Sequence, residues 1–123
     1  MHGYAIQRSV RQSPRKMRLV MDLIRGKGVN EAYAILQFNK KLAARQIAKT
    51  LKSAVANAEQ HAEREDETFD LDRLVIVDAQ VDMGSPLKRF HAAAQGRATP
   101  IRKPTSHVKI AVAEQPAKKK GAK

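Results

Sequence analysis

The 123-residue chain contains no cysteine and no tryptophan. Without cysteine it has neither a disulfide framework nor a thiolate metal site. No apolar run approaches the roughly 20 residues that a helix needs to span a bilayer. The first ten residues lack the apolar stretch and the small-residue cleavage site of a secretory signal. We therefore expect a cytoplasmic protein that has no membrane partner and carries no metal or other cofactor.

Large apolar side chains are also scarce. Hydrophobic residues make up 42% of the chain, but nineteen of them are alanine, and only five residues are phenylalanine or tyrosine. Alanine adds little buried area, and a short chain buries a smaller share of its surface than a large protein does. We expect one domain over residues 1–114 with a thin core, and a lysine-rich tail over 115–123 that is disordered on its own.

Acidic residues are missing from long stretches. The chain has 24 Lys and Arg against 12 Asp and Glu, a net charge of +12. Residues 1–30 carry seven basic groups and one acid, residues 83–113 carry six basic groups and no acid, and eight of the twelve acids fall within 61–82. A solvated surface normally mixes its signs, and a positive field attracts polyanions. This segregation favours phosphate binding over a merely soluble basic protein, with the acidic stretch facing water.

Hydrophobic spacing predicts three helices in the first half of the chain. Ser13 can cap a helix over about 14–25, which Gly26 and Gly28 end. Asn30 is a candidate cap for a short helix to about Phe38, and Asn39 for a longer one over about 41–61, on which Arg45, Lys49 and Lys52 occupy a separate face. The residues expected to face the core are Met17, Val20, Met21 and Ile24, then Ala34, Ile35 and Phe38, then Ala44, Ile47, Ala48, Leu51, Val55 and Ala58.

Alternating apolar residues predict three strands. The first covers 4–10, with Tyr4, Ile6 and Val10 on one side, and the last covers 106–113, with Val108, Ile110 and Val112. The middle strand, 74–83, should pair antiparallel with the last and present an apolar face of Val75, Val77, Ala79, Val81 and Met83. Residues 62–72 look like a solvated acidic linker. His61 with Glu63, Glu65 and Asp66 lacks the second histidine and the ordered frame of a metal site.

Residues 84–104 form an acid-free arm between the last two strands. Its cations are Lys88, Arg89, Arg97, Arg102 and Lys103. A compact domain rarely keeps so long a loop without a functional reason. Folded back on itself, the arm would reach about 30 Å beyond the sheet. A disordered surface loop is the alternative, but an arm with only positive charge fits a place surrounded by nucleic acid.

Four segments in order, SPRKMRLVMDLIRGK (13–27), LKSAVANAE (51–59), VDMGSPLKRFHAAAQGRA (81–98) and KPTSHVKI (103–110), closely resemble the bacterial large-subunit ribosomal protein twenty-two family. The resemblance covers roughly residues 5–114. It implies an α+β fold, with three helices packed on a small three-stranded antiparallel sheet and a long protruding β-hairpin. It also implies a structural role in the large ribosomal subunit, with no enzyme activity and no homo-oligomer.

The resemblance further implies that the hairpin passes through ribosomal RNA and that its tip lines the tunnel of the nascent polypeptide, with other large-subunit proteins as neighbours. The tunnel-lining residues would be Leu87, Lys88, Arg89, Phe90 and His91. The segment 91–94 departs from the family, whose members commonly have a proline and an arginine there. The RNA-binding residues would be Arg8, Arg11, Ser13, Arg15, Lys16, Arg18, Arg25, Lys27, Lys88, Arg89, Arg97, Arg102, Lys103, Thr105, Ser106 and His107.

Two other functions fit parts of the sequence. A DNA-architectural protein with β-arms is also small and basic, and a preference for duplex DNA over ribosomal RNA in a gel-shift competition would identify it. A nuclease needs carboxylates or histidines that converge beside the basic groove, but His91 and His107 have only Glu114 as an acidic neighbour in sequence, seven residues beyond His107. The spacing around Gly26-Lys27-Gly28 is not that of a phosphate-binding loop.

Overall fold

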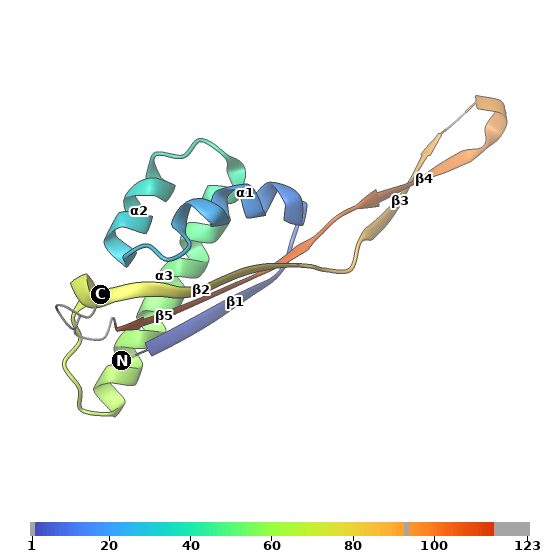
Figure 1. Ribbon diagram of the computed structural model, residues 1–123. Helices are drawn as coiled ribbons and strands as arrows, with labels where there is room; N and C mark the ends of the chain where they lie inside the picture. The colour runs from blue at the N-terminus through green and yellow to red at the C-terminus, as the bar shows by residue number, and fades with distance from the viewer. Residues whose placement is uncertain (1, 93, 115–123) are drawn as a thin grey trace.

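The computed structural model describes residues 2–92 and 94–114, so the expected disordered tail lies outside the described residues. Three helices pack on one side of a three-stranded sheet, and a two-stranded ribbon extends from this body (Figure 1). This confirms the α+β class. The elements are β1 (His2–Val10), α1 (Pro14–Ile24), α2 (Val29–Gln37), α3 (Leu42–Arg64), η1 (Leu71–Arg73), β2 (Leu74–Met83), β3 (Leu87–Ala92), η2 (Ala94–Gly96), β4 (Ala98–Lys103) and β5 (Ser106–Glu114).

Strand β5 is the centre of the three-stranded sheet. It pairs antiparallel with β1 on one side and with β2 on the other. The second pairing confirms the one expected between residues 74–83 and residues 106–113. Val108, Ile110 and Val112 are buried, as their alternation predicts. Helix α3 packs against β1 and β5, while α1 packs against β2. The core therefore lies between one face of the sheet and the helices.

A β-bulge divides β2 into two halves. The register moves from Ile76 opposite Val112 to Asp78 opposite Ala111, which leaves Val77 without an opposite residue. An extra residue reverses the side to which later side chains point. Leu74 and Ile76 are therefore buried before the bulge, and Ala79 and Val81 after it. The expected apolar face was wrong for Val75, which is half-buried, and for Val77 and Met83, which are 58% and 73% exposed.

Strand β1 turns its small residues toward α3. Gly3 and Ala5 are buried, whereas Tyr4 and Ile6 are exposed. Tyr4 and Ile6 therefore share one side of the strand as predicted, but Val10 is buried, beyond an irregularity in the pairing of β1 with β5, so the prediction was wrong for Val10. A Cβ on Gly3 would lie 2.4 Å from the backbone nitrogen of Ala58. Only glycine allows the strand and the helix to approach so closely.

Helix α1 forms as predicted. The Ser13 side chain accepts a hydrogen bond from the Lys16 backbone N–H at 3.2 Å. Proline follows at the first helical position, where its missing N–H costs nothing. Each of the four residues of the expected stripe, Met17, Val20, Met21 and Ile24, is fully buried. A local cap and a regular stripe therefore define this helix without help from the rest of the fold.

Helix α2 differs from the prediction in its cap and its buried face. Gly28, not Asn30, stands at the N-cap, and the Asn30 side chain donates a hydrogen bond to the Asp72 carboxylate at 2.6 Å. Phe38, expected in the core, is 81% exposed at the end of the helix. Ala34 is exposed as well, and Ile35 is only half-buried. The buried residues are instead Val29, Ala32 and Leu36.

Helix α3 is longer than predicted, because it continues three residues beyond His61. Lys41, not Asn39, stands at its N-cap. The Asn39 side chain instead accepts a hydrogen bond from the Lys41 N–H at 2.8 Å, in the turn that precedes the helix. The expected inward residues are buried, apart from Ala48 and Val55, which are half-buried. The acidic linker is shortened accordingly, and a 3₁₀ turn, η1, leads into β2.

Candidate nucleic-acid interface

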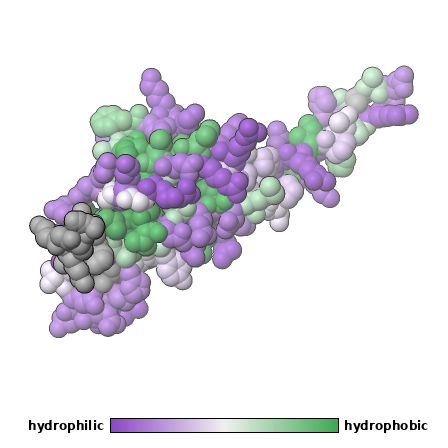
Figure 2. All heavy atoms as spheres, viewed as in Figure 1, coloured by the Kyte–Doolittle hydropathy of each residue, from purple (hydrophilic) through white to green (hydrophobic). Residues whose placement is uncertain are grey.

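The arm is a two-stranded antiparallel ribbon. Strands β3 and β4 pair from Leu87 opposite Lys103 to Ala92 opposite Ala98. Apart from Leu87 and Ile101, which are half-buried, the described residues of both strands are exposed. Figure 2 shows hydrophilic side chains along most of the arm, with a few hydrophobic ones between them. The ribbon therefore has no core of its own.

Like charges face each other across this ribbon. Lys88 stands directly opposite Arg102, and a pair of like charges at such a position destabilises a sheet. On the other face of the ribbon lie Arg89 and Lys103. Since no acid occurs between residues 83 and 113, nothing on the arm itself neutralises these cations. Such an arrangement suits a polyanion that approaches both faces.

The far end of the arm is the turn around η2. Gln95 and Gly96 have φ of 64° and 70°, and the Arg97 N–H reaches the Ala94 carbonyl at 3.5 Å. Leu87, Lys88 and Arg89 lie at the other end, nearest the body. The expectation that they adjoin the tip was therefore wrong. The pairing of the strands places Phe90, His91 and the turn farther out (Figure 1).

A group of hydrogen bonds fixes the base of the arm. The Gly84 N–H donates to the Thr105 carbonyl at 2.9 Å, and the Thr105 hydroxyl donates to the Ser85 carbonyl at 2.8 Å. The Ser106 hydroxyl donates to the Gln12 carbonyl at 2.6 Å. Thr105 and Ser106 are 3% and 0% exposed. Their side chains are engaged within the protein, and this burial speaks against the RNA contacts expected of them.

His107 belongs to the same region. Its Nδ1 accepts a hydrogen bond from the Ser9 N–H at 3.0 Å, and the ring is half-buried. Ser9 has a φ of 56°, next to an irregularity in the pairing of β1 with β5. Histidine thus satisfies a backbone donor where the strand is distorted. We assign His107 to the support of the arm rather than to a contact with a ligand.

The start of α1 and the base of the arm share a basic hollow. It has a volume of about 310 Å³, and its cations are Arg11 and Lys16 before and in α1 and Lys103 at the end of β4. The N-terminus of a helix carries partial positive charge and free N–H groups, which favour anions. Arg15 lies exposed on the same first turn. The fold therefore joins two basic segments that are far apart in the sequence.

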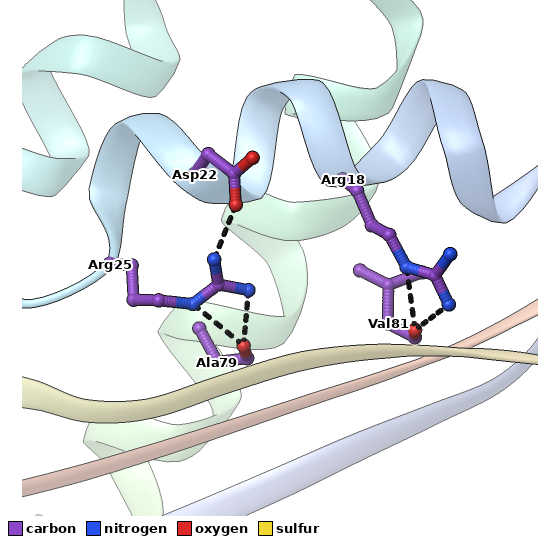
Figure 3. A network of polar contacts seen from close by, with 5 residues as sticks. All are labelled: Arg18, Asp22, Arg25, Ala79 and Val81. Atoms are coloured by element: carbon purple, nitrogen blue, oxygen red, sulfur yellow. Dashed lines mark hydrogen bonds and ion pairs between the residues drawn. The ribbon is translucent and has the colours of Figure 1, made fainter.

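Two arginines, Arg18 in α1 and Arg25 at its C-cap, are occupied within the protein (Figure 3). Arg18 donates through Nε and Nη2 to the Val81 carbonyl at 3.2 and 2.8 Å, and Arg25 donates in the same way to Ala79 at 3.2 and 2.7 Å. Arg25 also forms an ion pair with Asp22. Their guanidinium groups hold α1 on β2, so they are less available to a ligand than the sequence suggests.

The remaining candidate cations are Lys27, in an ion pair with Glu31 at 4.0 Å, and Arg8, exposed on β1. Within residues 2–92 and 94–114, no group of three or more metal-ligating side chains gathers, and no helix is long and apolar enough to cross a bilayer. Most of the cations predicted from the sequence therefore lie on the ribbon and around the basic hollow at its base.

This is a small basic α+β protein with an acid-free two-stranded arm. Residues 5–113 match the family model described as ribosomal protein L22p/L17e, and the chain belongs to that family. It is 50% identical over 115 residues to the large ribosomal subunit protein uL22 of Clostridium novyi, covering 94% of this chain and 99% of that protein. It is also 50% identical to the uL22 of Oceanobacillus iheyensis over 94% of this chain and 97% of that protein. The uL22 of Geobacter sulfurreducens is 49% identical over 85% of this chain and 90% of that protein.

Membership in this family makes the chain a structural constituent of the large ribosomal subunit. It is not an enzyme, and its place is the ribosome in the cytoplasm. The rival identification as a nuclease is thereby excluded.

Proposed function

We propose that the chain binds large-subunit ribosomal RNA through the arm and the adjoining surface of α1. The observation that carries the proposal is the pairing of Lys88 with Arg102 on an exposed ribbon that has no core and no acid. RNA phosphates around both faces would neutralise these charges and hold the ribbon in place. The proposed contacts are Arg8, Arg11, Ser13, Arg15, Lys16, Lys27, Lys88, Arg89, Arg97, Arg102 and Lys103.

Binding of this kind draws its free energy from released counterions and its specificity from shape. Each cation that meets a phosphate displaces condensed ions from the RNA. Arginine can also hold a phosphate with two hydrogen bonds, which lysine cannot do. Folded RNA is recognised mainly by its shape, and a ribbon of this length fits between RNA helices. Residues 1–114 would act as one folded unit, with the body held against RNA and neighbouring ribosomal proteins.

The far end of the arm is proposed to line the exit tunnel and to meet the nascent polypeptide. Phe90, His91 and residues 94–97 are its candidates, because they lie farthest from the body. Leu87, Lys88 and Arg89 would instead contact RNA along the stem. The small residues Ala92, Ala94 and Gly96 at this end would let it occupy a narrow passage.

Salt-dependent binding tests the RNA contact. Arg97→Gln, Arg102→Gln and Lys103→Gln together (the arm variant) should lower the slope of log K against log salt by roughly 2 to 3. The control variant, Lys41→Gln, Arg64→Gln and Lys109→Gln, removes the same charge from positions outside the proposed contacts. Equal slopes for the two variants would refute the proposal, and tighter binding of duplex DNA than of ribosomal RNA would support the DNA-architectural alternative.

Shortening the arm tests the tunnel role. Removing residues 91–92 and 98–99 keeps the turn and the pairing of the remaining strands and withdraws the tip by about 7 Å. The shortened protein should enter the subunit, while crosslinks from the tip to a stalled nascent chain should disappear. Unchanged crosslinks would refute tunnel lining, and failure to join the subunit would refute the division between stem and tip.

A further inference from the structure

A second basic surface lies between α2 and α3, on residues that the arm and its base do not use. It is a groove of about 750 Å³ with Leu36, Ala44 and Ala48 among its apolar residues. Lys40, Arg45, Lys49 and Lys52 line it together with Tyr33, and no acidic side chain does. The groove thus combines a shallow apolar floor with a wall of one charge.

The wall is a regular row of cations. Arg45, Lys49 and Lys52 follow each other at spacings of four and three residues, so they lie on one side of α3. At 1.5 Å per residue they form a row about 10 Å long. None of the three makes an ion pair with any residue that the structure describes. Like charges at these spacings destabilise a helix, and a bound polyanion would remove that cost.

The chain that borders the groove carries an exposed aromatic residue. Phe38 is 81% exposed and lies between Gln37 and Asn39, which both line the groove. Tyr33 lines the groove itself, and its phenol, which is neutral at physiological pH, can donate a hydrogen bond. A free aromatic face beside a row of cations is the combination that binds unpaired nucleotides, since bases stack on the ring while phosphates meet the charges.

We propose that this groove binds an unpaired stretch of ribosomal RNA, with its phosphates along Arg45, Lys49 and Lys52 and a base stacked on Phe38. An acidic amphipathic helix of a partner protein fits this groove poorly, because such a helix needs several large apolar pockets. Here two of the three apolar floor residues are alanines, and Leu36 is already 96% buried. The inference rests on the proposed RNA-binding function, to which it adds a second, independent contact.

The test uses the full chain and protein-free large-subunit ribosomal RNA in filter-binding titrations over a range of salt. The groove variant is Arg45→Gln, Lys49→Gln and Lys52→Gln, compared with the arm variant, the control variant and a combined groove and arm variant. If all three cations meet phosphate, the slope should fall by roughly 2 to 3, which corresponds to a loss of roughly a hundred- to a thousandfold at 0.1 M salt. The combined variant should lose more than either alone. Thermal unfolding checks that each variant is folded.

A Phe38→Ala variant tests the stacked base separately. It should weaken binding by about fivefold or more and leave the salt slope unchanged, because no charge is removed. Ultraviolet crosslinking of the wild-type complex should join a nucleotide to Phe38 or Tyr33. Exposed Val77 on β2, at 58%, provides the matched control, since Val77→Ala should leave binding as it is.

Each result distinguishes this inference from the proposed function. If the arm variant weakens binding and the groove variant behaves as the control variant, the groove inference is overturned while the proposed function stands. If neither differs from the control variant, RNA binding itself is refuted. If the groove variant binds free RNA normally and still fails to enter the subunit, the groove serves a protein neighbour, and the inference is wrong.

Discussion

Replacing Ser106 with alanine should loosen the junction between the arm and the body. Ser106 is opposite Val10 on β1 and Met83 on β2, so all three strands meet there. Its hydroxyl has no exposed surface and donates to the Gln12 carbonyl at 2.6 Å. Gln12 immediately precedes the cap of α1. One hydroxyl therefore ties the central strand to the segment that carries the first basic residues of α1.

The expected cost comes from the part-buried Gln12 carbonyl, which loses its donor. A buried polar group left without a partner costs about 1 to 3 kcal/mol, whereas an exposed one is satisfied by water. The change removes a single oxygen, so the cavity adds little. For a domain of this size, about 1 kcal/mol lowers the melting temperature by roughly 4 °C. We expect Ser106→Ala to melt at least 4 °C below the wild type.

Thermal and urea unfolding provide the measurement, with Ser85→Ala as the control. Ser85 is also a serine at the base of the arm, but its side chain is exposed and only its backbone carbonyl accepts a bond. Ser85→Ala should therefore stay within about 0.5 kcal/mol of the wild type. If the two variants unfold alike, the Ser106 hydroxyl does not stabilise the junction, and the support assigned to it is wrong.

Three further substitutions test the packing and the charge state of the body. Gly3→Ala should destabilise the protein by about 1 to 3 kcal/mol or more in urea unfolding, because its Cβ would lie 2.4 Å from the Ala58 nitrogen; an unchanged midpoint would contradict that contact. Met17→Ala should lower the free energy of unfolding by about 2 to 5 kcal/mol. Its control is Leu19→Ala, on the exposed face of α1, which should change stability by less than about 0.5 kcal/mol. Equal effects of the two substitutions would refute the orientation of the helix. Burial raises the pKa of Tyr33 above 10.0, so the folded state retains the phenol proton to a higher pH than the unfolded state does. The contribution of the protonated phenol to stability is present below about pH 10 and should be lost as the pH rises further. Tyr33→Phe should remove that part of the pH dependence, and parallel curves for the two proteins would count against the burial.

The elements that the sequence predicts best have their determinants close together along the chain. Ser13 and Pro14 set the start of α1, and the stripe that follows has the period of a helix, so no distant contact is needed to place it. Strand β5 is similar, because Val108, Ile110 and Val112 alternate without interruption. Their buried faces could be predicted from spacing alone.

Faces that depend on the partner element could not be predicted in this way. The bulge at Val77 reverses the direction of the following side chains, and nothing in an unbroken apolar run marks where it falls. Strand β1 buries Gly3 rather than Tyr4 because α3 comes so close that no side chain fits. In the short α2, two sets of residues have helical spacing, and only contact with the rest of the core decides between them.

For the candidate site, the sequence predicts which segments supply the basic residues better than it predicts how the fold arranges them. Segregated charge indicates the arm and the start of α1, but the order of residues along the arm depends on the register that pairs Leu87 with Lys103. The burial of Ser106 could not be predicted either, because serine is more often exposed than buried. The α2–α3 groove was missed, although the spacing of Arg45, Lys49 and Lys52 was already a signal.

The carbonyls of Ala79 and Val81, which Arg25 and Arg18 occupy, lie on a strand that ends its sheet. An open edge of this kind is where the sheet of another molecule could add a strand and begin aggregation. Two guanidinium groups placed along it leave fewer acceptors for an intruding chain. Between synthesis and assembly, when the protein is without its final surroundings, these arginines therefore help to keep each copy separate from the next.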